Sequence, residues 1–258
     1  MLHKIEDITN KILLGDCLEE LKKFPDGCVD YCIADFPYNI SNYGNSITKK
    51  GNNFIKGDFG EWDKWDDMEE YLKWVFKISK EIQRVLKPLA SCLFFFDNRQ
   101  AGWIAYELER RGIFIYKSPI IWIKNNPIPK IRKIGFRSSF EHAVWLINSQ
   151  ERYIGNATIT IKSKVFNFQE QIEMMNVMKY NIGQKESKHP TEKPLILTKR
   201  MINIFTNEND IILDPFLGSG TTAVAAKTLD RNYIGIEKEI KYITIAKERL
   251  KTVQDKLF

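Results

Sequence analysis

The stretch that decides the fold is DIILDPFLGSGTTA, residues 210–223. It opens with an apolar run that predicts a β-strand, and it closes with GSGTTA, which fits the pattern G-x-G-x-x-A at the start of a helix. Glycines at these positions let the backbone turn tightly and come close to a ligand. The first turn of the helix that follows has free N–H groups that attract an anion. Thr221 follows Gly220 where a phosphate loop of the G-K-[ST] type needs lysine, which excludes that kind of nucleotide site.

A carboxylate at the end of the next apolar run extends this prediction. Glu237 lies 17 residues after Gly220, where its two oxygens can accept hydrogen bonds from both hydroxyls of a ribose. A glycine loop followed by such an acid fits NAD and S-adenosylmethionine equally well. A glycine turn that only packs the strand on the helix is the plain structural alternative.

Outward from this segment, apolar runs alternate with helical patterns along most of the chain. Strands are expected at residues 12–14, 29–34, 91–96, 113–123, 143–147, 210–213 and 233–236. Helices are expected at residues 17–24, 101–111, 194–205, 223–229 and 240–250, and from an N-cap at Asp66 to Lys87-Pro88. Residues 39–65 are expected to form a long loop. The alternation predicts an α/β fold with a doubly wound, mostly parallel, Rossmann-like sheet and helices on both faces.

Acidic residues close several of the apolar runs. Asp16, Asp35, Asp214 and Glu237 each follow an expected strand. Ligands of doubly wound sheets bind beyond the carboxyl ends of the strands. These four acids therefore need a functional explanation.

The tetrapeptide Asp35-Phe36-Pro37-Tyr38 distinguishes between NAD and S-adenosylmethionine as the ligand of the glycine loop. An aromatic amine is a poor nucleophile because its lone pair is delocalised into the ring, and a site helps by accepting both of its N–H bonds. We expect the Asp35 carboxylate and the Phe36 carbonyl to be these acceptors, because a residue before proline is extended and would aim its carbonyl outward. Tyr38 offers a flat face to a base taken out of the duplex. An ordinary strand-to-loop turn is the alternative interpretation.

Charge and cysteine content narrow the class of protein further. The chain has 258 residues, enough for one well-buried α/β domain and a small insertion. Its formal net charge is +6, and residues 124–188 alone hold eleven Lys/Arg against five Asp/Glu, which favours a polyanion as partner. The four cysteines lack metal-ligand spacing, so we expect free thiols and no metal site. None follows a proline, as attack on ring carbon C5 of cytosine would need. The charged N-terminus and short apolar runs predict a soluble, cytoplasmic protein without a membrane partner.

In combination these motifs resemble the bacterial DNA amino-methyltransferases, which use S-adenosylmethionine. Residues 35–38 resemble the family's D-P-P-Y, with Phe36 in place of the first proline, and residues 214–222 resemble its cofactor motif. Residues 189–194, HPTEKP, resemble the segment that leads into the helix flanking the cofactor. The catalytic motif comes first, as in the family's β order, and the resemblance covers nearly the whole chain. It implies a catalytic domain at residues 1–123 and 189–258, with an inserted basic target-recognition region at residues 124–188.

The resemblance also implies site residues. Those for methyl transfer are Asp35, Phe36, Pro37 and Tyr38. Those for the cofactor are Asp16, Cys17, Asp35, His189, Thr191, Lys193, Pro194, Asp214, Pro215, Phe216, Gly218, Ser219, Gly220, Thr221, Thr222 and Glu237. Those for DNA are Lys130, Arg132, Lys133 and Arg137. The Lys193-Pro194 turn and the glycine loop would hold the methionine part, Glu237 the ribose, and Asp16 with Cys17 the adenine ring. Residues 12–16 are also the available candidate for the strand beside the one that ends at Glu237.

The expected activity is site-specific methyl transfer to N6 of adenine in duplex DNA, by base flipping and direct in-line attack. Asp rather than Ser at position 35 favours adenine over the N4 amine of cytosine, which is the main alternative. Expected partners are double-stranded DNA, a second copy of the chain and a restriction endonuclease. An NAD-dependent oxidoreductase, an RNA or small-amine methyltransferase and a catalytically inactive DNA-binding module are less favoured functions for the same sequence.

Overall fold

The computed structural model describes residues 2–39, 47–50, 53–56, 65, 67–127, 129, 136–148, 175–182 and 192–254. Its centre is an eight-stranded sheet in the order β1-β10-β9-β2-β5-β7-β6-β8. The strands of this sheet are β1 (Lys11–Leu14), β2 (Val29–Asp35), β5 (Leu86–Phe96), β6 (Ile115–Lys124), β7 (Phe140–Ile147), β8 (Val177–Tyr180), β9 (Ile211–Asp214) and β10 (Asn232–Glu237). Strand β7 runs antiparallel to both of its neighbours, and the other pairs are parallel. The predicted mostly parallel, doubly wound α/β fold is confirmed.

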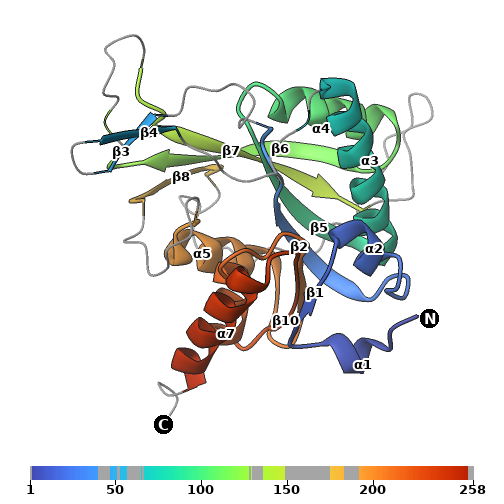
Figure 1. Cartoon of the computed structure of the whole chain (residues 1–258). Coiled ribbons are helices and arrows are strands. Elements are labelled where there is room, and N and C mark those ends of the chain that lie inside the picture. Colours follow the sequence, from blue (N-terminus) through green and yellow to red (C-terminus); the bar gives the residue numbers. More distant parts are fainter. Residues whose placement is uncertain are drawn as a thin grey trace.

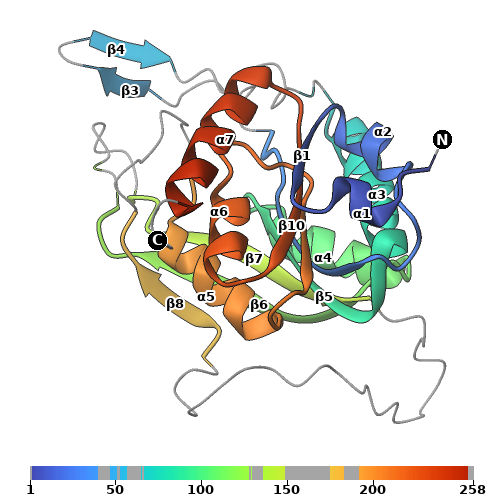
Figure 2. The same ribbon diagram turned by 90° about the horizontal axis from the view of Figure 1, so that it is seen from below.

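Helices cover both faces of the sheet (Figures 1 and 2). On one face lie α1 (Ile5–Ile8), α2 (Cys17–Leu21), α3 (Met68–Val85) and α4 (Ala101–Arg110). On the other lie α5 (Leu195–Phe205), α6 (Thr221–Thr228) and α7 (Ile240–Gln254). Each face has its own apolar core, one packed under α2–α4 and one under α5–α7. Burial of these two side-chain layers is the main force that holds the helices on the sheet.

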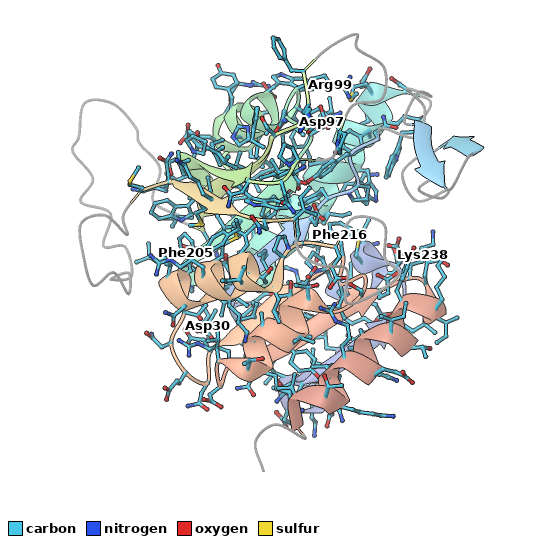
Figure 3. All side chains as sticks on the ribbon, turned by 90° about the vertical axis from the view of Figure 1, so that its left-hand side faces the viewer. Asp30, Asp97, Arg99, Phe205, Phe216 and Lys238 are labelled. Atoms are coloured by element: carbon cyan, nitrogen blue, oxygen red, sulfur yellow. The ribbon has the colours of Figure 1, made fainter. Side chains whose placement is uncertain are left out.

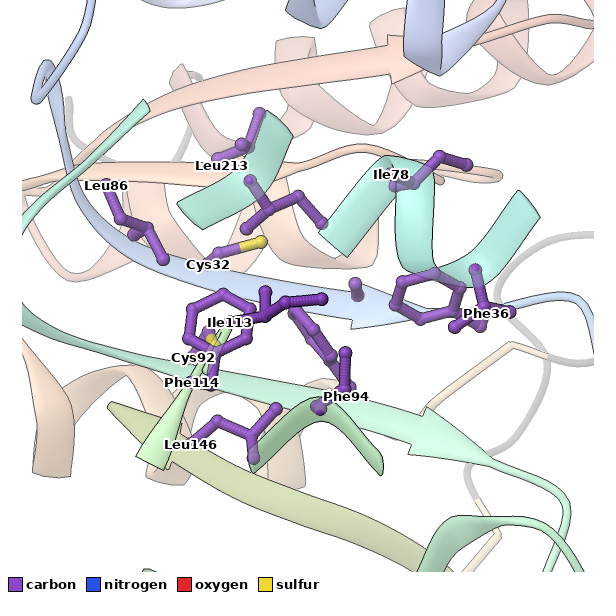
Figure 4. Close-up of a cluster of buried hydrophobic side chains, with 14 of the residues drawn as sticks. Cys32, Phe36, Ile78, Leu86, Cys92, Phe94, Ile113, Phe114, Leu146 and Leu213 are labelled. Carbon is purple, nitrogen blue, oxygen red and sulfur yellow. The ribbon is translucent and has the colours of Figure 1, made fainter. Parts of the chain in front are cut away.

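The core packed under α2–α4 explains why the sequences of the central strands are continuous apolar runs. Cys32 of β2 and Cys92 of β5 are register partners on neighbouring parallel strands, and both are fully buried. Figure 4 shows them among Leu213, Leu146 and the ring of Phe94. All four cysteines are free thiols, as expected.

Strand β1 completes the cofactor half of the sheet. It pairs in parallel with β10, with Leu14 opposite Glu237. The expectation that residues 12–16 supply this strand is confirmed. The pairing places the turn at Gly15-Asp16 beside the end of β10.

Two local predictions are wrong. The helix N-cap is Asp67 and not Asp66, because it is the Asp67 carboxylate that accepts from the backbone N–H of Glu69. Residues 39–65 are not simply a loop, since β3 (Ile47–Lys50) and β4 (Asn53–Lys56) pair as an antiparallel hairpin. The sequences ITKK and NFIK lack the strict alternation of apolar and polar residues by which a half-buried strand is recognised.

The region 124–188 contains two strands of the central sheet. Both β7 and β8 fall inside it, and β7 lies between β5 and β6. The part of this region outside the sheet is therefore shorter than the range that the sequence suggests. Among the described residues, no helix is long and apolar enough to cross a membrane.

Candidate active site

A cavity of about 570 Å³ opens at the carboxyl edge of the parallel strands. The tetrapeptide after β2 lines it with all four residues, and Gly218 and Glu237 line it from the glycine loop and β10. Its volume is that of a typical small-molecule site. In Figure 3, Phe216 lies between Asp97 on the acceptor side and Lys238 on the cofactor side, and all three line the cavity. The two predicted halves of the site therefore meet in one space.

The cofactor side is built from the ends of β1, β9 and β10. Asp16 caps α2, with its Oδ1 accepting from the backbone N–H of Leu18 at 2.9 Å. Cys17 is buried beside it, and burial raises the pKa of its thiol. A neutral thiol next to a fixed carboxylate suits the edge of an uncharged adenine ring.

Glu237 is held by the backbone of the two turns around it. Its Oε2 accepts from the N–H of Gly218 and its Oε1 from the N–H of Glu239, each at 2.8 Å. Burial raises the pKa of this carboxyl group, and the backbone hydrogen bonds oppose that shift. A carboxylate has about four acceptor positions, so the backbone donors leave it room to accept from a ribose hydroxyl.

Two separate constraints, backbone conformation and close packing, require glycine in the glycine loop. Gly218 (φ 54°) and Gly220 (φ 85°) both have left-handed backbone, which glycine adopts without penalty. A Cβ added to Gly220 would lie 2.6 Å from the Cβ of Ala246 on α7. Gly220 therefore also permits the close packing of the loop on this helix.

Six of the expected cofactor residues are not among those that line the cavity: Pro194, Asp214, Ser219, Gly220, Thr221 and Thr222. The Asp214 carboxylate accepts from the N–H of Phe216 at 3.0 Å, and burial raises its pKa to about 7 against the hydrogen bonds from Thr222 and Phe216. It braces the loop from inside.

Arg249, which sequence reasoning missed, braces the same loop from outside. Its guanidinium donates to the carbonyl of Ser219 at 2.9 Å and to Thr221 Oγ1 at 3.1 Å. It also forms a buried ion pair with Glu192 at 2.7 Å. This contact ties the segment before α5 to the loop before α6. Arg249 lies in the second half of α7, outside any recognisable sequence motif, so the sequence did not indicate its role.

On the acceptor side, one carboxylate oxygen is left for a ligand. Asp35 Oδ1 is buried and has no hydrogen-bond partner among the residues that the structure describes. A buried oxygen without a donor is costly, and a ligand N–H would satisfy it. Burial raises the pKa of Asp35, Lys193 opposes the shift, and Glu141 adds to it.

Hydrogen bonds and ring contacts hold the turn at Phe36, the residue that replaces proline. The N–H of Phe36 donates to Phe95 O at 3.3 Å, and the next carbonyl, that of Pro37, accepts from the hydroxyl of Tyr71 at 2.8 Å. The Phe36 ring is buried in an aromatic cluster that includes Phe94 and Phe96, with centroids 5.0 and 4.8 Å away. Figure 4 shows Phe36 and Phe94 in this cluster. Packing thus supplies the rigidity that the missing proline ring would have given.

Lys193 contacts Asp35, which the sequence did not predict. It lines the cavity, and its Nζ is 2.6 Å from Asp35 Oδ2 and 3.1 Å from Glu141 Oε2. The expectation for this residue was a contact with the methionine part of the cofactor. In this structure its ammonium group is directed at Asp35, the first residue of the expected catalytic tetrapeptide.

Part of the expected DNA-binding set can be placed. Arg137 is exposed, it follows the almost fully exposed Phe136 (98 %), and the next residues Ser138 and Phe140 line the cavity. His189 and Thr191 of the cofactor set, and Lys130, Arg132 and Lys133 of the DNA set, lie outside the described residues.

A sheet of this topology, with one cavity joining a glycine-loop half to a turn that can accept an amine, defines an amino-methyltransferase of the S-adenosylmethionine-dependent class. Comparison with known sequences narrows the class. The family model N6_N4_Mtase, described as DNA methylase, matches residues 29–248, so the chain belongs to this DNA methylase family. It is a DNA methyltransferase, and its methyl donor is S-adenosylmethionine. An oxidoreductase, which the glycine loop by itself left open, is excluded.

Curated relatives agree over most of the chain. The type II methyltransferase M.HinfI of Haemophilus influenzae is 34% identical, covering 98% of this chain and 72% of its own. The type II methyltransferase M2.DpnII of Streptococcus pneumoniae is 34% identical over 93% of this chain and 90% of its own.

Solved structures agree on the fold. A crystal structure of M1.HpyAVI in complex with S-adenosylmethionine is 30% identical, with a TM-score of 0.62 over 93% of this chain and 99% of that one. The cytosine-N4-specific PvuII DNA methyltransferase has the same fold, with a TM-score of 0.69 at 16% identity, over 96% and 90% of the two chains.

Proposed function

We propose that this protein transfers a methyl group to the N6 amino group of adenine in duplex DNA, after the base has left the helix. The observation that carries the proposal is the buried Oδ1 of Asp35, which has no hydrogen-bond partner among the described residues and belongs to a residue that lines the same cavity as Glu237. An acceptor in that position is what an entering amino group requires.

The residues present fit the cofactor. S-adenosylmethionine, when bound, supplies a methyl group activated by a sulfonium. Glu237 has acceptor positions left for ribose hydroxyls, and Gly218 exposes backbone to the same space without a side chain. Asp16 and Cys17 border the far end, which suits the adenine ring of the cofactor.

On the other side of the cavity, the chain's own groups hold the target amine. Asp35 Oδ1 accepts one N–H bond and the Phe36 carbonyl accepts the other, so that the nitrogen lone pair faces the methyl donor. The amine takes the methyl group with that lone pair and then gives one N–H proton to the Asp35 carboxylate. Positioning of this kind provides most of the rate acceleration in a direct transfer. Tyr38 stacks on the base, and its phenol is fixed near Glu141 and Lys193 at 3.5 and 3.4 Å.

Duplex DNA as the substrate is supported by the surface beside the cavity. An exposed aromatic ring next to an exposed arginine suits a base step and a phosphate, respectively. Phe136 and Arg137 lie in the segment that continues into the cavity wall. Target recognition is assigned to this segment and to the basic residues 124–188 around it.

Two partner predictions go with this function. The relatives carry the designation type II, which supports a restriction endonuclease with the same recognition sequence. A second copy of the chain stays a prediction. An enzyme that acts on the DNA of a bacterial cell is expected in the cytoplasm.

The experiment is methylation of duplex DNA with S-adenosylmethionine labelled in the methyl group, followed by nucleoside analysis. N6-methyladenine is the expected product. N4-methylcytosine would instead assign cytosine as the target base, and label in single-stranded RNA but not in duplex DNA would reject the proposed substrate.

A further inference from the structure

Four charged side chains form an alternating chain on the acceptor side of the cavity. Lys193 Nζ binds Asp35 Oδ2 at 2.6 Å and Glu141 Oε2 at 3.1 Å. Glu141 Oε1 binds Lys124 Nζ at 2.8 Å. The two acids and two lysines carry no net charge together, and all four line the cavity.

The topology of the sheet brings these residues together. Asp35 ends β2 and Lys124 ends β6, both at the carboxyl edge. Glu141 is the second residue of β7, and because β7 is antiparallel its start lies at that same edge. Lys193 precedes the helix α5 on the face that carries the glycine loop.

Burial makes these contacts consequential. The side chains of Lys193 and Lys124 are only 13% and 12% exposed, and those of Asp35 and Glu141 are 29% and 21% exposed. A charge largely removed from water is stable only when partners replace the lost hydration. Lys193 also lies over the Phe95 ring, 4.9 Å from its centroid, which limits where its ammonium group can go.

We propose that Lys193 and Glu141 are positioning residues of methyl transfer. Lys193 binds Oδ2 of Asp35 and so turns Oδ1 toward the target amine. Glu141, which Lys124 holds in turn, binds the same ammonium group and keeps it in place. By sharing this ammonium group, Glu141 also keeps the Asp35 carboxylate from being neutralised by a full ion pair. This inference rests on the proposed function only in its last step, the identity of the amine.

The charges predict opposite effects of the two residues on Asp35. Groups that face it are Lys193, Glu141, the Tyr38 phenol and, from β9, Asp214. Burial raises the pKa of Asp35, Lys193 lowers it and Glu141 raises it. Burial alone would raise the pKa of Glu141, but Lys193 and Lys124 hold it at about 2, so Glu141 is charged throughout the working range.

The test uses Glu141→Gln, which keeps the shape and an acceptor oxygen but removes the charge. The acid limb of the pH–kcat profile should move to lower pH, and kcat should fall by roughly 10²-fold because the acceptor loses its set geometry. The KM for S-adenosylmethionine should be unchanged. Lys193→Met should move the acid limb to higher pH, and Lys193→Arg should restore it toward the original position.

A measurement without the reaction completes the design. Side-chain carboxyl NMR of the whole protein follows the titration of Asp35, assigned by the signal lost in Asp35→Asn. The pKa of Asp35 should fall in Glu141→Gln and rise in Lys193→Met. Glu107→Gln, which removes an acid paired with Arg110 on α4, is the matched control and should leave both readings unchanged.

The outcomes separate the two proposals. If Glu141→Gln leaves the Asp35 titration unchanged and merely lowers thermal stability, the positioning role is wrong. If Lys193→Met does not fold, Glu141→Gln and Lys193→Arg still decide the question. Opposite NMR shifts in an enzyme that methylates cytosine would support the positioning role while rejecting adenine as the target.

Discussion

Asp35 and Glu237 end two parallel strands that are separated by β9 alone, and both line the same cavity. Neighbouring strands lie about 4.8 Å apart, so two strand spacings place the turn after β2 about 10 Å from Glu237, the acid proposed to bind the ribose. That span is bridged by the cavity, with Phe216 and Gly218 along it. In the proposed function, a methyl donor held at Glu237 would extend toward an amine held at Asp35, and direct transfer would need no residue to carry the methyl group in between.

Replacing Asp35 by Asn should lower kcat on the order of 10²-fold or more, the range found when one preorganised polar group is removed from a reacting centre. The amide keeps the size of the side chain but offers only one acceptor oxygen, and its NH₂ group would face either Lys193 or the target amine. Equilibrium dialysis with labelled S-adenosylmethionine should give a dissociation constant close to that of the wild type. An active Asp35→Asn enzyme would remove this residue from the mechanism.

Tyr38 tests base stacking separately from its hydroxyl contacts. Tyr38→Ala should weaken productive binding of the flipped base by about 1–3 kcal/mol, seen mainly in KM for DNA. Tyr38→Phe keeps the ring and loses the hydroxyl, whose contacts are the long ones to Glu141 and Lys193 at 3.5 and 3.4 Å and an interaction with Asp35, so it should stay within a few-fold of wild type. Equal losses in the two variants would show that the hydroxyl, and not the ring face, is the functional part.

The sequence was enough to predict most of the central sheet and the two ends of the cavity. Glycine loops and acids after apolar runs are local patterns, and a parallel sheet brings the carboxyl ends of its strands to one edge. Asp35, Gly218 and Glu237 could therefore be placed in one site from the sequence. The strand at residues 12–16 was also placed correctly beside β10.

Contacts that depend on strand direction, or on packing between segments far apart in the sequence, could not be predicted from the sequence. Glu141 precedes the apolar run of β7, and nothing local in FEHAVWLI shows that the strand is antiparallel and starts at the active edge. Lys193 and Asp35 are 158 positions apart, so their contact is set by how α5 docks on the sheet. Arg249 presents the same difficulty, because its role depends on a buried partner far away in the sequence.

Gly220 should be intolerant of even the smallest side chain. Its φ of 85° disfavours any other residue, and the added Cβ would come within 2.6 Å of Ala246 Cβ. Gly220→Ala should lose about 1–3 kcal/mol of unfolding free energy in urea, from overpacking and backbone strain together. Gly102→Ala in α4 is the control, because a Cβ there meets nothing within 4 Å. It should stabilise the protein by up to about 1 kcal/mol through helix propensity, and similar losses at both positions would contradict this account.

Asp214→Asn should change how stability depends on pH. Burial raises the pKa of Asp214 from 3.8 to about 7, so the folded protein holds this proton where the unfolded chain has lost it. Stability therefore falls as pH rises between these values, and between pH 5 and pH 8 the linkage amounts to about 2–3 kcal/mol. The amide stays neutral and its oxygen can still accept from the N–H of Phe216, so Asp214→Asn should gain that amount relative to wild type on going from pH 5 to pH 8. Urea unfolding at the two pH values measures the difference, with Asp26→Asn, whose side chain is 79% exposed, as the control. Parallel pH profiles for Asp214→Asn and wild type would contradict this prediction. They would mean that the Asp214 carboxylate is charged at little cost in the folded protein and braces the glycine loop as an ordinary hydrogen-bonded acid.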